Sequence, residues 1–309
     1  MNDGAASAPR VESTLRRLEL DVFRRLDGLL QGDHLGLVPA PGSEAGESRE
    51  YQAGDDVRRM DWAVTARTTI PHVRDTIADR ELETWIVVDR SASLDFGTAQ
   101  FEKRDLALAM VAAVGFLTSR AGNRVGALVL GNDRTFFVPA RAGREAMLAL
   151  LHRIDSVPRA EHAQAPAGDL RGALRTVAKL ARRRGLVVVI SDFLTDCDWQ
   201  PALRALAVRH DVLAVEILDP REVELPPVGL VTFVDTETGR RVEVQTASER
   251  VRARFAEAAA RQRARIAQDV RVAGAEHVVL RTDRDWLLDL VKYVVTRKRR
   301  RTARVAPAR

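Results

Sequence analysis

Cysteine is almost absent from this chain of 309 residues, which contains only Cys197. A single cysteine cannot form an intramolecular disulfide, and it excludes a zinc site built from several cysteines. Long apolar runs are absent too: the longest, Leu106 to Leu117, has twelve residues, which is too short to cross a bilayer. The N-terminus lacks the basic-then-apolar pattern of a signal peptide. We therefore expect a soluble, cytoplasmic protein with no transmembrane segment.

Several catalytic motifs are also missing. The six histidines show neither H-E-x-x-H nor H-x-x-x-H spacing, which argues against a zinc hydrolase. The sequence contains no G-x-S-x-G elbow, P-loop or G-x-G-x-x-G, the motifs typical of serine hydrolases and of nucleotide binding. These absences favour a binding protein over an enzyme.

Charge is ordinary in amount but uneven in place. The chain is 46% hydrophobic and 30% charged, with a formal net charge of +6. Eight basic residues and no acidic one lie between Lys292 and Arg309, whereas residues 1–291 hold 41 basic and 43 acidic residues. The positive charge thus belongs to the C-terminal end. We predict a disordered basic tail over residues 297–309, which contacts anionic surfaces but recognises no specific nucleic acid.

Apolar periodicity predicts an α/β core over residues 84–219. Short apolar runs, which are typical of strands buried on both faces, alternate with amphipathic helical stretches. Such alternation predicts a mainly parallel sheet flanked by helices, as in Rossmann-type folds. The expected strands are Trp85–Asp89, Arg124–Leu130, Thr135–Val138, Leu186–Ser191 and Val212–Ile217, and the expected helices are Phe101–Ser119, Gly143–Ile154, Leu170–Arg184 and Pro201–Arg209.

The flanking regions lack this regular alternation of strands and helices. Residues 1–31 form a polar tail and an amphipathic helix, Glu12–Leu30, and residues 32–83 are irregular and partly β. Residues 220–296 complete the domain with a β-hairpin, a long helix capped by Ser248, a strand, and a last helix capped by Asp283.

Two of the apolar strands end in a carboxylate. The first ends V-V-D-R-S-A-S, with Asp89, Ser91 and Ser93, and the second ends V-I-S-D, with Ser191 and Asp192. In open parallel sheets, ligands bind beyond the carboxyl ends of the strands where the strand order reverses. Carboxylates and hydroxyls at one edge suit Mg²⁺ or Mn²⁺. The alternative is that these residues only form turns and cap the following helices.

The same residues carry a family resemblance. Asp89-x-Ser91-x-Ser93, followed by L-D-F-G and by the strand-end Asp192, resembles a von Willebrand factor type A domain with its metal-ion-dependent adhesion site. Upstream, R-E-Y-Q-A-G-D-D-V-R-R-M-D-W-A-V-T-A-R (Arg49–Arg67) resembles the signature of the bacterial family DUF58, in which it precedes a von Willebrand A-like core. The resemblance runs from about Gly32 to Asp219, and more weakly to the last helix.

This resemblance implies a non-enzymatic, metal-assisted protein-binding module. One Mg²⁺ or Mn²⁺ would be held by Asp89, Ser91, Ser93 and Asp192, and a partner's Glu or Asp would complete its coordination. The implied partner is a MoxR-type AAA+ ATPase or its client, in chaperone-like remodelling or assembly. The alternative is a Mg²⁺-dependent hydrolase or phosphotransfer enzyme that uses the same carboxylates. A third interpretation is a protein that binds an anionic polymer or a membrane surface through the tail.

One departure from the adhesion-site pattern concerns the metal. The family takes a Thr from the loop before the helix that leads to the second carboxylate strand, and here Gly168 and Asp169 stand at that place. Either Asp169 only caps the helix that follows, or its carboxylate replaces the missing hydroxyl as a metal ligand.

The signature stretch has two interpretations of its own. Acidic and basic side chains alternate around a tryptophan, so the stretch forms either a salt-bridged clasp between the N-terminal segment and the sheet or an exposed surface that binds a partner. The residues concerned are Tyr51, Asp55, Asp56, Arg58, Asp61, Trp62 and Arg67.

Overall fold

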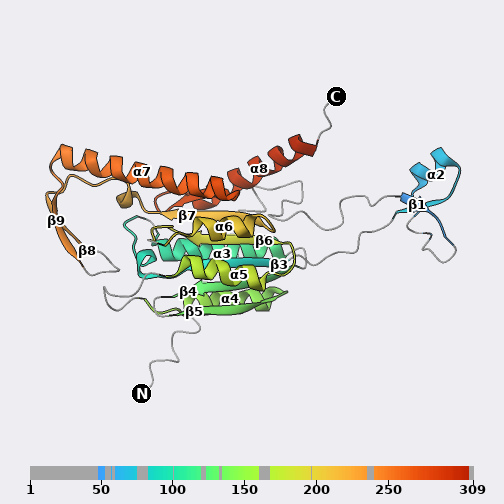
Figure 1. Ribbon diagram of the computed structural model, residues 1–309, viewed down its shortest axis with the longest axis horizontal. Helices are drawn as coiled ribbons and strands as arrows, with labels where there is room; N and C mark the ends of the chain where they lie inside the picture. The colour runs from blue at the N-terminus through green and yellow to red at the C-terminus, as the bar shows by residue number, and fades with distance from the viewer. Residues whose placement is uncertain are drawn as a thin grey trace, which may run out of the picture. The chain divides into compact units, whose positions relative to one another are not determined.

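The computed structural model describes residues 48–52, 57, 60–74, 83–99, 101–119, 123–131, 134–159, 168–195, 197–234 and 240–305. These residues fall into two compact units, one with the described residues between 48 and 74 and the other with those from 83 onward (Figure 1). The expected helix Glu12–Leu30 and the loop of residues 32–46 lie outside the described residues.

A six-stranded sheet forms the centre of the larger unit, in the order β10-β7-β6-β3-β4-β5. All neighbouring pairs are parallel except β4 and β5, which are antiparallel. The mainly parallel sheet predicted from the sequence is therefore confirmed. Its strands are β3 (Glu83–Asp89), β4 (Arg124–Leu130), β5 (Thr135–Arg141), β6 (Leu186–Ser191), β7 (Asp211–Leu218) and β10 (Glu276–Arg281).

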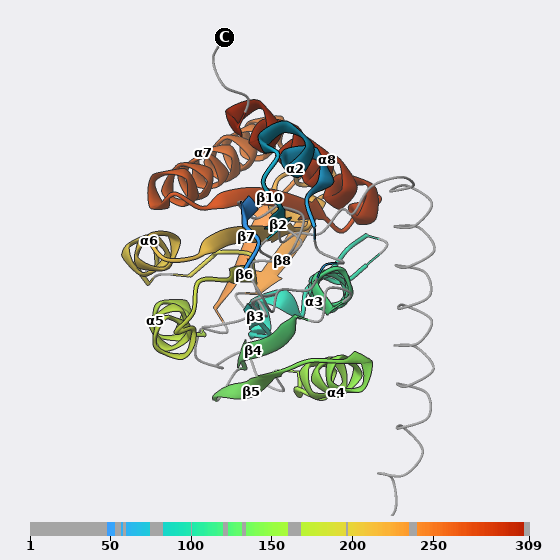
Figure 2. The ribbon, with the colours of Figure 1, turned by 90° about the vertical axis from the view of Figure 1, so that its right-hand side faces the viewer.

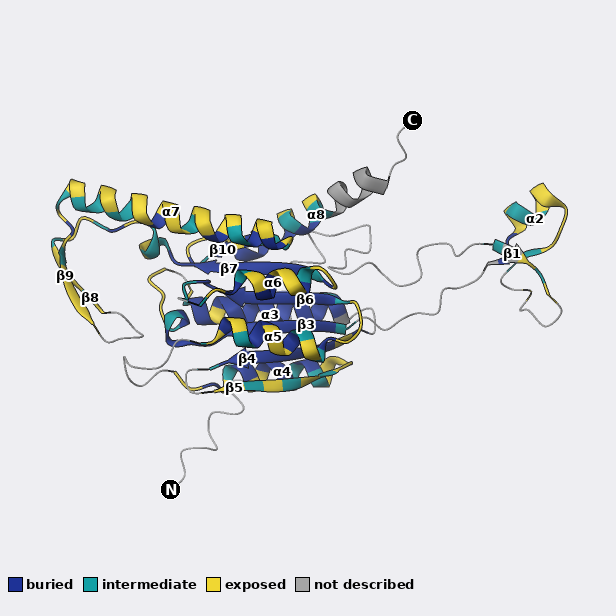
Figure 3. Ribbon diagram, viewed as in Figure 1, coloured by how far each residue is buried: buried dark blue, intermediate teal, exposed yellow. Residues whose placement is uncertain are grey.

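The central strands are buried on both faces, as their uninterrupted apolar runs predict. Every residue of β6 is buried, and so is every residue of β3 after Glu83. Each buried aliphatic side chain contributes about 1.5–3 kcal/mol to folding, so these two strands anchor the core. Figure 3 shows the sheet as the most buried layer of this unit.

Helices cover both faces of the sheet (Figure 2). One face packs against α3 and α4, and the other packs against α5, α6 and α7. The bounds are α3 (Lys103–Ser119), α4 (Arg144–Asp155), α5 (Leu170–Leu180), α6 (Gln200–Ala207) and α7 (Glu249–Ala273).

The C-terminal region adds the edge strand β10 and the last helix, α8 (Trp286–Val305), which packs against it. Two expectations about this region are wrong. Asp283 does not cap α8, because its carboxylate pairs with Arg281, and it is Asp285 that accepts from the Leu288 N–H. Residues 297–305 are helical, so the tail predicted to be disordered from residue 297 begins as part of α8; the last four residues lie outside the described part.

The expected hairpin is present as β8 (Leu230–Val234) and β9 (Arg241–Gln245), which pair in antiparallel register. None of its residues is buried. The helix predicted to begin after Ser248 starts at Glu249, with Ser248 in an extended N-cap conformation but without a side-chain hydrogen bond to the helix.

The smaller unit contains β1 (Ser48–Glu50), α2 (Trp62–Thr68) and β2 (His72–Arg74). β1 and β2 pair in antiparallel register, and Met60 forms an isolated bridge to Val73. Nowhere in the described part of the chain is a helix both long and apolar enough to cross a membrane.

Candidate functional site

The strand order places the two carboxylate-bearing strand ends side by side. β3 pairs directly with β6, and β3 has β4 on its other side. The chain therefore leaves β3 toward one side of the sheet and later returns on the other, so the order reverses between β3 and β6. The loops beyond this point, Arg90–Asp95 and Asp192–Thr195, form what we call the ligand edge. Ligands of open α/β sheets bind at such a position.

Asp89 is a buried carboxylate at this edge. Its Oδ1 accepts from the Ser91 N–H at 2.9 Å, and its Oδ2 accepts from the Ser191 hydroxyl at 2.8 Å. Burial raises the pKa of Asp89, and the nearby charge of Asp192 raises it further, against the lowering effect of these hydrogen bonds. No cationic side chain of the described residues pairs with it. Asp89 is thus a buried carboxyl group without a cationic partner among the described residues, and its charged form is costly in a protein interior.

The two serines of the D-x-S-x-S turn come together. The Ser91 and Ser93 hydroxyls are hydrogen-bonded to each other, with their oxygens 3.2 Å apart. Adjacent ligands of an octahedral Mg²⁺, with bonds of about 2.1 Å, are separated by about 3.0 Å. The hydroxyl pair therefore has the spacing of two neighbouring ligands.

Asp192 already has a cation. The Lys103 ammonium, which is buried at the start of α3, donates to Asp192 Oδ2 at 2.8 Å and to Glu222 Oε1 at 2.6 Å. Burial alone would raise the pKa of Asp192, but the Lys103 charge and hydrogen bond outweigh it and the pKa is lowered. Conversely, burial opposes the charge on Lys103, and the two carboxylates nevertheless raise its pKa. Asp192 Oδ1 accepts from the Leu194 N–H at 3.0 Å.

Arg263 of α7 extends this network of charged side chains. Arg263 donates to the Asp192 main-chain oxygen at 3.2 Å and to Glu216 Oε1 at 2.9 Å. Sequence reasoning missed Lys103 and these further charges. A signal for Lys103 existed, because the chain has only four lysines and this one stands three residues before the longest apolar run, which begins at Leu106.

A third strand-end carboxylate, Asp219 after β7, was also missed. It is fully buried and accepts from the Thr98 N–H and hydroxyl at 2.9 and 2.6 Å, and from the Thr282 hydroxyl at 2.9 Å. Burial opposes its charge, but these hydrogen bonds lower the pKa of Asp219 below the ordinary value. With its acceptor positions used in this way, Asp219 ties the loop after β3 to the end of β10.

The geometry supports the capping role for Asp169. The side chain is exposed and accepts from the Gly172 N–H at 2.8 Å, as an N-cap does. Gly168, in contrast, faces the site: a Cβ at that position would lie 3.8 Å from Asp89 Oδ1. The place where the family has a Thr is therefore next to Asp89 and carries no side chain. The helix that Asp169 caps ends at Leu180 and not at Arg184, so Arg182–Arg184 follow the helix.

These residues fit one divalent ion in part. Ser91, Ser93 and Asp89 offer hard oxygen donors of suitable chemistry. Both carboxylates at this edge accept hydrogen bonds through both oxygens, but only Asp192 is paired with a cation, Lys103. No cluster of three or more His, Cys, Asp or Glu side chains suited to a metal occurs in the described part of the chain. A metal at this edge would thus depend on hydroxyls more than on carboxylates.

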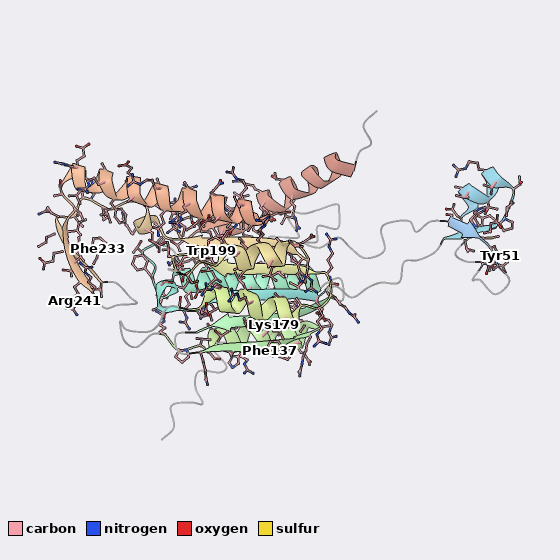
Figure 4. The ribbon with its side chains drawn as sticks, in the orientation of Figure 1. Tyr51, Phe137, Lys179, Trp199, Phe233 and Arg241 are labelled. Carbon is pink, nitrogen blue, oxygen red and sulfur yellow. The ribbon has the colours of Figure 1, made fainter. Side chains whose placement is uncertain are left out.

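The signature residues belong to the smaller unit. Asp61 is buried, caps α2 through the Ala63 and Val64 N–H groups, and accepts from the Ser48 hydroxyl at 2.8 Å. Trp62 is 69% exposed, and Arg67 is also exposed. Tyr51 is half-buried, and Figure 4 labels it in this unit. Asp55, Asp56 and Arg58 lie outside the described residues. Whether the stretch clasps the sheet stays a prediction, while exposed Trp62 offers a surface for recognition.

Proteins of similar sequence occur in mycobacteria. The chain is 56% identical over 301 residues to "Uncharacterized protein Rv1480" of Mycobacterium tuberculosis (strain ATCC 25618 / H37Rv), covering 96% of this chain and 92% of that protein. It is 48% identical over 162 residues to "Uncharacterized protein MAV169" of Mycobacterium avium, covering 52% of this chain and 94% of that protein.

Solved structures with a similar arrangement include von Willebrand A domains. The conserved hypothetical protein BatB from Bacteroides thetaiotaomicron matches with a TM-score of 0.46 at 15% identity, over 71% of this chain and 99% of that one. The SpRpn10 VWA domain matches with a TM-score of 0.37 at 15% identity, over 69% and 95%. The family described as "Protein of unknown function DUF58" matches residues 47–265, and the chain belongs to that family.

Proposed function

We propose that this protein is a protein-binding module whose binding site is the ligand edge, and that one Mg²⁺ or Mn²⁺ assists the binding. The observation that carries the proposal is the state of Asp89, a buried carboxylate with a raised pKa and no cationic partner among the described residues, beside two hydroxyls spaced as metal ligands. A divalent cation would neutralise this charge.

The residues of the chain have distinct roles in this proposal. Ser91 and Ser93 would hold the ion, and Asp89 would hold it while also fixing the turn through the Ser91 N–H. When bound, the ion supplies a positive charge and an open coordination position for a carboxylate of the partner. Lys103 neutralises Asp192, which limits the negative charge that would repel that incoming carboxylate.

As partner we propose the class that the family resemblance implies, a MoxR-type AAA+ ATPase or its client protein, in chaperone-like remodelling or assembly. Exposed Trp62 is a candidate second contact, because aromatic side chains are enriched at the energetic centres of interfaces. The proposal of a Mg²⁺-dependent hydrolase uses the same residues but has no observation of its own in favour; turnover of a generic phosphoester with Mg²⁺ would support it.

A thermal-shift measurement tests the metal. If Mg²⁺ or Mn²⁺ binds only the folded state, a concentration of 100 times Kd adds about 2.7 kcal/mol, which raises Tm by roughly 5–10 °C for a unit of this size. Asp89→Asn should abolish the shift, and the Asn side chain can still accept from the Ser91 N–H. An equal shift in Asp89→Asn would remove Asp89 from the site.

A pull-down tests the partner. A purified MoxR-type ATPase should be retained by the protein with Mg²⁺ and released by EDTA, and Asp89→Asn should behave as the wild type does in EDTA. Retention that is unaffected by both EDTA and Asp89→Asn would contradict metal-assisted binding.

A further inference from the structure

The outer face of α5 carries a row of cations. Arg171, Arg175 and Lys179 are exposed and follow one another at four-residue spacing, so they lie on one side of the helix over about 12 Å. Arg182, Arg183 and Arg184 continue the positive charge past the helix end. Figure 4 labels Lys179 on this helix. Between Leu170 and Gly185 the sequence has six basic residues and no acidic one.

The stability of α5 does not explain this row. Arg171 is in the first turn, where the helix dipole disfavours a cation, and that turn has no acidic residue. Like charges four residues apart also destabilise a helix. Lys179, in the last turn, and the cations after Leu180 lie at the end that the dipole favours. The fold therefore gains nothing from Arg171 and Arg175.

The arginines of α7 show the contrast. Arg261 pairs with Glu257 at 2.6 Å, and Arg265 pairs with Asp269 at 3.8 Å, both at four-residue spacing. On α5, the described residues offer no ion-pair partner to Arg171, Arg175 or Lys179. The Arg209 guanidinium, which follows the end of α6, donates to the Arg182 main-chain oxygen at 3.3 Å and adds a further cation beside the row.

The position of the row connects it to the ligand edge. α5 begins directly after Gly168 and Asp169, and Gly168 faces Asp89. The first cation of the row, Arg171, is thus within one helical turn of the candidate site. A partner whose carboxylate enters the ligand edge would place its neighbouring residues along α5.

The chemistry of the face favours an acidic protein segment. The exposed side chains of α5 are Arg171, Arg175, Thr176 and Lys179. This set has no aromatic side chain on which nucleic-acid bases stack and no apolar side chain that would insert into a lipid interface. Cations spaced by one helical turn match carboxylates spaced in the same way on a partner helix.

We propose that the α5 face, defined by Arg171, Arg175 and Lys179, binds an acidic segment of the protein partner beside the ligand edge. This deepens the proposed function and rests on it only for the location of the segment's end; the charge recognition itself needs no metal.

The test is the binding of a fluorescein-labelled peptide of repeated Glu-Ala-Ala-Glu units, measured by fluorescence anisotropy with the full chain at low ionic strength. The double variant Arg171→Glu/Arg175→Glu should weaken binding by about tenfold or more. The control is Arg250→Glu/Arg254→Glu on α7, which changes two exposed arginines and the net charge equally and should have little effect. The α5 variant should retain the wild-type Tm, because it places an acid in the first turn and turns the like-charge pair of positions 175 and 179 into a Glu–Lys pair, which offsets the like-charge pair that remains between positions 171 and 175.

Three results would overturn the inference: equal loss in both double variants, no loss in the α5 variant, or a greater loss for duplex DNA or anionic phospholipid vesicles than for the peptide. Asp89→Asn, measured in Mg²⁺ and in EDTA, separates this inference from the proposed function. If Asp89→Asn leaves peptide binding unchanged while the α5 variant loses it, the proposal for the α5 face is supported and the metal-site proposal is contradicted. The opposite result contradicts only the proposal for the α5 face.

Discussion

At the scale of single residues, Gly168 limits how a divalent ion is held. It does not have a positive φ, so its backbone accepts other residues. A Cβ there would meet Leu130 Cδ2 at 3.3 Å and Leu130 Cβ at 3.4 Å, a tight fit that needs only a small shift of one side chain. The position can therefore carry the side chain that the family pattern has.

Gly168→Thr should bring a hydroxyl next to Asp89 and increase Mg²⁺ affinity by about tenfold, or about 1.4 kcal/mol. Isothermal titration calorimetry measures this directly. Gly168→Val is the matched control, because it has the same shape without the hydroxyl. If Val increases the affinity as much as Thr does, the effect is one of packing and not of coordination.

His210 is a buried titratable residue away from the ligand edge. Both of its ring nitrogens lack a hydrogen-bond partner among the described residues, and the side chain is 5% exposed. Burial lowers the pKa of His210, and the charges of Arg209 and Arg184 lower it further. The unfolded chain therefore binds a proton at a higher pH than the folded one.

This linkage predicts that the free energy of unfolding falls as the pH drops below about 6.5, the ordinary value for histidine, by at most about 1.4 kcal/mol per pH unit. Urea unfolding between pH 5 and pH 7.5 checks the slope. His210→Leu should flatten it, whereas His152→Leu, at an exposed position of α4, should not. A slope that persists in His210→Leu belongs to another group.

Sequence reasoning at this scale found Asp89, Ser91, Ser93 and Asp192, because a strand that ends in a carboxylate is visible in one short stretch of sequence. Lys103 escaped it: the lysine meets Asp192 across 89 positions of the chain. Such a contact depends on how α3 packs on the sheet, which no local pattern encodes.

At the scale of elements, periodicity predicted which segments are strands and helices better than where they end. β4 and β6 have the predicted bounds, since apolar runs begin and end sharply. α5 ends four residues before the predicted Arg184, although Gly185 follows as a stop signal. α8 continues past residue 296, where the disordered tail was predicted to begin, so its basic end forms helix despite its lack of apolar spacing.

The packing of α8 changes the truncation we expect to be tolerated. Val294 is buried, and Arg297 pairs with Glu276 at 3.0 Å, with its side chain only 10% exposed. The sequence, which lacks apolar periodicity from Arg297 on, predicts that removal of everything after Tyr293 leaves folding almost unchanged. Truncation after Tyr293 would thus remove a buried apolar side chain, Val294, and the ion pair between Arg297 and Glu276.

Truncation after Tyr293 should therefore cost about 2 kcal/mol from the apolar area of Val294, and more from the loss of Arg297. Truncation after Arg297 keeps both residues and should leave the free energy of unfolding unchanged. Chemical unfolding of the two shortened chains gives the comparison. Equal stabilities of the two shortened chains would show that residues 294–297 contribute nothing to the free energy of unfolding.

At the scale of the whole molecule, the sheet was predictable because its strands are buried on both faces and read as continuous apolar runs. The join of β10 to β7 was not, since parallel neighbours can come from any later part of the chain. The division into two units is marked in the sequence by the change from the irregular signature stretch to regular alternation near residue 84.

The formal net charge of the whole chain comes from one short segment at its C-terminal end. Residues 298–309 hold six cations and no acid, so their removal takes the formal net charge from +6 to zero. Attraction to nucleic acid without base recognition depends on such cations, because each neutralised phosphate releases counterions. We expect weak binding of duplex DNA by the full chain, with log K falling against log salt at a slope of about −5 if all six cations engage phosphates.

Truncation after Arg297 should abolish this binding while it leaves folding and the Mg²⁺ response intact. Arg171→Glu/Arg175→Glu should leave the salt slope unchanged, because the α5 face recognises carboxylates of a protein and the tail supplies the phosphate contacts. Fluorescence anisotropy over a range of salt concentrations measures both variants against the wild type. A slope that survives truncation but disappears in the α5 variant would assign DNA binding to the folded unit and would remove the distinction between a protein-binding face and a polyanion-binding tail.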